Sequence, residues 1–126
     1  LLRETIRPDI TSDMGHHNFS YMIYPHENGA VEAGVNKFAF QFNEQLVKSD
    51  ASYDGDTFEP LYLQAMKDSE DGSMTVIRLS EQDGKRGKIK LSKSVKLLDM
   101  LENVIGEAVD TLEYKPFEII TIGIQK

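Results

Sequence analysis

Cysteine and tryptophan are both absent from this chain of 126 residues. Without cysteine there can be no disulfide, no thiolate nucleophile and no cysteine-ligated zinc. No run approaches the roughly 20 apolar residues that a membrane-spanning helix requires. Basic side chains are the minority, with 14 against 21 acidic ones, and the net charge of −7 is a poor match for a polyanion such as nucleic acid. The length and the 40% hydrophobic content indicate one folded domain over residues 1–126.

The dominant periodicity of the sequence is two residues, which is typical of β-strands. Strands are predicted at residues 19–24, 61–66, 74–79, 87–91, 94–98, 109–114 and 117–124. Asp83-Gly84 lies between the third and fourth of these, and Asp-Gly favours a tight hairpin turn. With a similar turn at Asp71-Gly72, three consecutive strands are expected to form a meander. The predicted fold is mainly β, an antiparallel β-sandwich with one short helix.

The short helix is predicted within residues 30–45. Val31, Val35, Phe38 and Phe42 recur there at helical intervals and would share one face, which Phe40 does not fit. The polar stretch 48–59 is expected to be a surface loop. Residues 97–104 are compatible with either a helical turn or a bent strand.

Few residues suggest chemistry. Asp13, His16 and His17 could offer oxygen and nitrogen ligands to zinc, but adjacent histidines on a strand point to opposite faces. The alternative is one exposed and one packed histidine. The acidic clusters at 54–56 and 68–72 lack the spacing of a calcium loop and are expected to be solvated turns.

Nucleophilic catalysis finds no support, because the sequence has neither a Gly-x-Ser-x-Gly elbow nor a phosphate-binding glycine loop. Six basic residues fall between positions 85 and 96 without an interleaved aromatic, which favours a solvated hairpin over a nucleic-acid site. The tyrosines could stack on sugars, but most lie in strand patterns that predict packing. The residues alone indicate a β-rich module without a catalytic centre of its own.

The two ends suggest a fragment. The chain opens on Leu1-Leu2-Arg3 without an initiator methionine, and it closes inside an apolar run that is typical of a strand. We therefore expect that this chain is cut from a longer polypeptide.

Several segments, taken in order, resemble a known family. The pattern Asp13-x-Gly15-x-His17-x-Phe19-x-Tyr21, followed by Pro25-His26, is similar to the C-terminal part of family 38 glycoside hydrolases, the class II α-mannosidases. The resemblance is closest to the bacterial and cytosolic branch. It continues through Val76-Ile77-Arg78-Leu79, Gly84-Lys85-Arg86-Gly87 and Pro116-Phe117-Glu118-Ile119.

The resemblance implies a parent enzyme that is a retaining exo-α-mannosidase with one zinc ion. The nucleophile, the acid/base and the zinc ligands of that family lie in an upstream α/β barrel, and none of them maps onto this chain. This chain would be an accessory β-sandwich domain, inactive alone, that packs on the barrel and on helical domains of the same polypeptide.

Within this chain, Arg3, Asp13 and His17 are the residues that the resemblance places at the rim of the substrate cleft. Met14 stands where the Golgi and lysosomal branch has arginine, which argues against sugar contact at that position. We expect no metal or cofactor in the fragment, no nucleic-acid or membrane partner, a neutral mannoside substrate and a cytoplasmic, bacterial setting. The alternative is a stand-alone β-sandwich that binds carbohydrate or protein.

Overall fold

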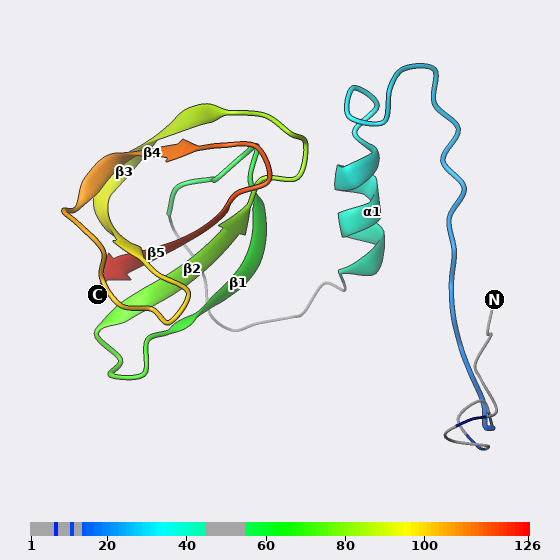
Figure 1. The fold of residues 1–126 in the computed structure, drawn as a ribbon, viewed down its shortest axis with the longest axis horizontal. Coiled ribbons are helices and arrows are strands. Elements are labelled where there is room, and N and C mark those ends of the chain that lie inside the picture. The colour runs from blue at the N-terminus through cyan, green and yellow to red at the C-terminus, as the bar shows by residue number, and fades with distance from the viewer. Residues whose placement is uncertain (1–6, 8–10, 12–13, 45–54) are drawn as a thin grey trace.

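The computed structural model describes residues 7, 11, 14–44 and 55–126 (Figure 1). One helix, α1 (Val35–Asn43), precedes five strands: β1 (Tyr62–Asp68), β2 (Met74–Ser80), β3 (Gly87–Leu98), β4 (Val109–Tyr114) and β5 (Ile119–Gln125). All strand pairs are antiparallel, and the spatial order is β1-β2-β5-β3-β4. The prediction of a mainly β, antiparallel fold with one short helix is confirmed.

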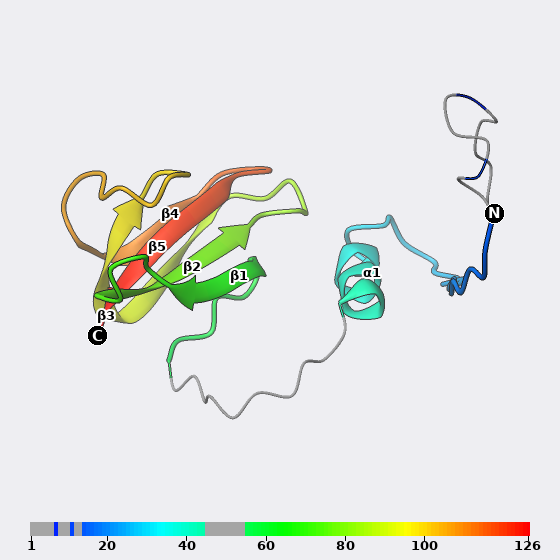
Figure 2. The same cartoon turned by 90° about the horizontal axis from the view of Figure 1, so that it is seen from below.

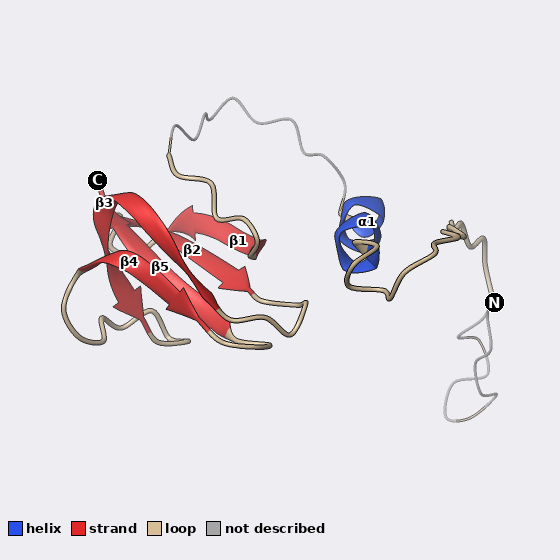
Figure 3. Ribbon diagram, turned by 90° about the horizontal axis from the view of Figure 1, so that it is seen from above, coloured by secondary structure: helices blue, strands red, loops and turns tan. Residues whose placement is uncertain are grey.

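The sheet is bent at its longest strand. β3 pairs with β4 through Gly87–Lys90 and, beyond a register shift, with β5 through Lys96–Leu98. The β3–β4 pair therefore folds over the part formed by β1, β2 and β5, as the curved ribbon in Figure 3 shows. The two strands predicted at 87–91 and 94–98 are one continuous element.

A single apolar core lies within this bend. It combines alternate residues of four strands, as period two requires; Ile77 and Ile122, which face each other across the β2–β5 ladder, have no solvent exposure. The other members of the core cluster are Leu61, Leu79, Ile89, Leu91, Val95, Leu112, Tyr114 and Ile120.

The expected meander is wrong at its second turn. Asp83-Gly84 does turn the chain, with Gly84 at φ 71°, but β2 and β3 are not hydrogen-bonded neighbours. Instead β5 lies between them and pairs with both. A turn signal is local, whereas the choice of partner depends on which apolar faces meet, and here Ile120 and Ile122 of β5 complete the core against β2.

Residues 97–104, which could have been helix or bent strand, end β3 at Leu98 and then form a tight loop. Asp99 holds it: the carboxylate accepts hydrogen bonds from the backbone N–H of Leu101 and of Asn103, and Leu98 bridges to Val104. Lys67 of β1 pairs with Glu102 at 2.7 Å, so the loop is fastened to the far edge of the sheet.

Residues 19–24, predicted as a strand, are extended but have no ladder with any other described segment. In Figures 1 and 2 they run beside α1, on the side of the helix away from the sheet. The predicted surface loop at 48–59 is described only from residue 55 onward, and there it carries no helix or strand.

Candidate functional site

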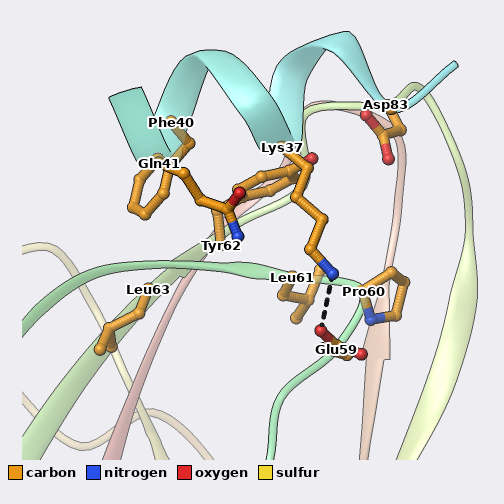
Figure 4. Close-up of a pocket in the computed structure, with 10 residues that line it drawn as sticks. Lys37, Phe40, Gln41, Glu59, Pro60, Leu61, Tyr62, Leu63 and Asp83 are labelled. Atoms are coloured by element: carbon orange, nitrogen blue, oxygen red, sulfur yellow. Dashed lines mark hydrogen bonds and ion pairs between the residues drawn. The ribbon is translucent and has the colours of Figure 1, made fainter. Parts of the chain in front are cut away.

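A groove lies between α1 and the start of β1 (Figure 4). It has a volume of about 360 Å³. Apolar groups from both elements line it, and the ion pair between Lys37 Nζ and Glu59 Oε1, 3.2 Å long, stands at its rim. Its lining consists of Gly34, Lys37, Phe40, Gln41, Glu59, Pro60, Leu61, Tyr62, Leu63 and Asp83.

The groove exists because α1 is attached to the sheet through one side only. Phe40 packs on Tyr62 of β1 with ring centroids 5.4 Å apart. One turn earlier, the Asn36 side-chain amide donates to the carbonyl oxygen of Gln82 at 2.8 Å and to Asp83 Oδ1 at 3.0 Å. Residues four apart share a helix face, so Asn36 and Phe40 together direct that face toward β1.

This attachment reverses the expected orientation of the helix. Phe40, which does not fit the predicted apolar face, makes the contact with the sheet. Phe38 and Phe42, on the predicted apolar face, remain exposed at 42% and 43%. The apolar face of α1 therefore points away from the domain core.

Tyr62 gives the groove a polar group that stays neutral. Burial raises the pKa of its phenol, and the nearby carboxylates of Asp83 and Glu81 raise it further, because both disfavour the phenolate. The phenol therefore remains a hydrogen-bond donor at neutral pH. With the Gln41 amide and the ion pair, the groove can bind a ligand by packing and hydrogen bonding.

Glu81 fixes the loop beside the groove. Its carboxylate is buried, with 4% of the residue exposed, and it accepts four backbone N–H bonds of 2.9–3.0 Å. Three donors, Asp83, Gly84 and Lys85, belong to the β2–β3 loop, and the fourth, Phe117, belongs to the β4–β5 turn. Burial raises the pKa of Glu81, but the four donors together outweigh it and hold the pKa below the ordinary value.

Of the three cleft-rim candidates, only His17 lies within the described residues. Arg3 and Asp13 lie outside the described residues. His17 is exposed on the extended segment and is not among the lining residues. Sequence reasoning does not find Asn36 or Glu81, because each acquires its role from a contact with a residue distant in sequence. Tyr62 is among the tyrosines that the sequence offers for sugar stacking, but its partner Phe40 is not visible in the sequence.

Two other expectations concern metals and membranes. Across residues 14–44 and 55–126, no three His, Asp or Glu side chains are grouped in a way that could hold a metal ion. Within the same described part of the chain, no helix is both long and apolar enough to cross a bilayer.

Comparison with known proteins gives one family and several relatives. Residues 60–122 match the family described as glycosyl hydrolases family 38 C-terminal beta sandwich domain. Alpha-mannosidase G of Dictyostelium discoideum is 30% identical over 96% of this chain, and the chain covers 13% of that protein. Alpha-mannosidase 2C1 of Mus musculus is 45% identical over 37% of this chain, covering 4% of that protein. No solved structure matches the chain significantly.

Proposed function

This chain belongs to the C-terminal beta sandwich domain family of the family 38 glycosyl hydrolases. We propose that it is an accessory domain of an α-mannosidase that acts on α-mannosides. The observation that supports this most directly is the position of the match: residues 60–122 contain β1 to β4 and most of β5. The relatives that share this region are named α-mannosidases, and the chain spans only 13% of the length of the Dictyostelium protein.

In this proposal the chain does not carry the reacting groups. The zinc ion, the nucleophile and the acid/base of a retaining mechanism belong to a catalytic barrel upstream in the same polypeptide, with helical domains between. The role of this domain is to stabilise that assembly and to complete the cleft with Arg3, Asp13 and His17. A neutral, hydroxyl-rich mannoside is compatible with the net charge of −7, because a neutral substrate is not repelled by an acidic surface.

The test compares the longer polypeptide with this chain alone on an aryl α-mannoside. We expect zinc-dependent hydrolysis by the polypeptide, with mannose released first as the α-anomer, and none by the isolated chain. Hydrolysis by the isolated chain would contradict the accessory role. Binding of mannosides by the isolated chain, with an inactive polypeptide, would favour the alternative of a stand-alone carbohydrate-binding module.

The rim residues are tested in the polypeptide by Asp13→Ala and His17→Ala. Loss of one hydrogen bond to substrate is worth about 1.4 kcal/mol, so each variant should lower kcat/KM about tenfold. Lys93→Ala, at an exposed position on β3, is the matched control and should leave kcat/KM unchanged. Unchanged turnover in both rim variants would reduce this region to a scaffold.

A cytoplasmic location, predicted from the lack of cysteine, is checked separately by cell fractionation.

A further inference from the structure

Among the described residues, one exposed apolar surface lies on the far side of α1 from the sheet. It consists of the apolar face of α1 and the extended residues 19–24, which we call the outer face. Figures 1 and 2 both place α1 between the sheet and this segment. The exposed rings of Phe38 and Phe42 form its helical part. Large apolar side chains gathered in this way on one surface are typical of an interaction site.

The extended segment has the composition of a strand that is covered on both faces. Phe19, Tyr21 and Ile23 point to one face, and they are exposed at 54%, 71% and 80%. Met22 and Tyr24 alternate with them on the other face. Apart from Ser20, the segment is thus apolar or aromatic on both faces, which is typical of strands inside a sheet that is packed on its two sides.

The backbone of this segment has no partner in the described part of the molecule. No backbone–backbone hydrogen bond joins residues 18–24 to any other described residue. The two edge strands of the sheet, β1 and β4, pair with β2 and β3 and not with this segment. An extended apolar strand with free N–H and C=O groups is a template for pairing with another sheet edge.

The segment is nevertheless held in place at its C-terminal end. The Tyr24 ring packs on Phe38 with centroids 4.5 Å apart, and its hydroxyl donates to the carbonyl oxygen of Ala33 at 3.2 Å. Asn36 and Phe40 in turn connect α1 to the sheet and the β2–β3 loop, so Tyr24 links the extended segment to the sheet through the helix.

We propose that residues 19–24 add as a β-strand to the edge of a sheet in a neighbouring domain of the same polypeptide, with Phe38 and Phe42 packing against that domain. This deepens the proposed function and rests on the chain being part of a longer polypeptide. Two comparisons support that occupant. The family match begins at residue 60, so the segment lies outside the matched region. The Dictyostelium relative aligns with 96% of this chain, yet the chain covers only 13% of that protein.

A sheet in the same polypeptide is also favoured over a second copy on physical grounds. A covalently linked partner is present at a high effective concentration, whereas a second copy must be captured from solution. Strand addition uses main-chain hydrogen bonds for affinity and pockets for alternate side chains for register, which is what residues 19–24 offer.

Hydrogen exchange measured on the longer polypeptide and on the isolated chain tests the proposal. In the polypeptide, the amides of residues 18–24 should exchange about 100-fold or more slowly than in the isolated chain, because ladder hydrogen bonds must open before exchange. Equal exchange rates in the two proteins would overturn the proposal. So would slow exchange already present in the isolated chain, which would indicate pairing within the chain or between copies.

A variant and its control locate the effect. Ile23→Asp places a charge on the exposed face of the segment and should return the amides of 18–24 to fast exchange in the polypeptide. Leu101→Asp makes the same change at a matched exposed position, 83% against 80%, in the β3–β4 loop, and should leave that protection intact. Protection that survives Ile23→Asp, or is lost equally in Leu101→Asp, would contradict the proposal that residues 19–24 add to a neighbouring sheet.

The readout separates this proposal from the proposed function. Protected amides in a polypeptide that does not hydrolyse aryl α-mannosides would contradict the mannosidase activity and support the strand. Hydrolysis by a polypeptide whose amides at 18–24 exchange freely would support the activity and overturn the strand.

Discussion

Replacing Glu81 with glutamine is expected to destabilise the domain severely, because this buried carboxylate accepts hydrogen bonds from both the β2–β3 loop and the β4–β5 turn. Each of its oxygens accepts two backbone N–H bonds: Oε1 from Asp83 and Lys85, and Oε2 from Gly84 and Phe117. An amide oxygen can keep two of these four. The NH₂ group would then meet the other two donors, which lose their acceptor.

The magnitude follows from the number of bonds lost. A hydrogen bond to a charged group contributes about 1.5–3 kcal/mol, so the loss of two costs about 3–6 kcal/mol. Domains are commonly stable by only about 5–15 kcal/mol, so this loss is a large fraction of the total. Urea denaturation at pH 7 measures it, with Glu107→Gln, an exposed glutamate in the β3–β4 loop, as the control that should change stability by less than about 0.5 kcal/mol.

The pH dependence supplies an independent check. The pKa of Glu81 is lowered in the folded state, so its contribution is complete above the unfolded pKa of about 4.3 and is lost as the pH falls through the folded pKa. The stability gap between wild type and Glu81→Gln should therefore be constant near neutrality and shrink below about pH 4. A gap no larger than that of the Glu107→Gln control, or one independent of pH, would refute the reasoning.

Three further predictions concern other parts of the fold. Gly87→Val should destabilise the chain by about 1–3 kcal/mol in urea denaturation, because a Cβ there would lie 2.8 Å from Cζ of the buried Tyr114 ring; full stability would show that the ring can move. Asp71 should titrate near pH 2 by NMR, since backbone N–H and hydroxyl donors of its own turn lower its pKa to about 2. The ionised carboxylate stabilises the folded state slightly above the ordinary pKa of 3.8, and this stabilisation is lost as the pH falls toward 2. Asn36→Asp should detach α1, seen as faster amide exchange in the helix, because two carboxylates would then face each other, and Asp83→Asn in the same chain should restore the contact; a helix unchanged by Asn36→Asp would rule out this attachment.

The candidate site shows where sequence reasoning has to stop. The helical interval of four residues located α1 correctly, but composition assigned its core face to Phe38 and Phe42. The sheet instead contacts Asn36 and Phe40, because Gln82, Asp83 and Tyr62 offer a hydrogen-bonding and aromatic partner there. A partner 22 to 47 positions away is not visible in a local pattern.

The local pattern of the sequence predicts which segments are extended, because period two and β-branched residues are local properties of the chain. It located the strands that became β1, β2, β4 and β5, the helix α1, the turn at Asp71-Gly72, and the absence of disulfides. Three features depend on the packing of the whole chain: β5 separates β2 from β3, one bent strand covers 87–98, and Glu81 joins two loops that are distant in sequence. Those outcomes depend on which apolar faces bury one another and on which buried donors need an acceptor, and both are settled by the whole chain rather than by any one segment.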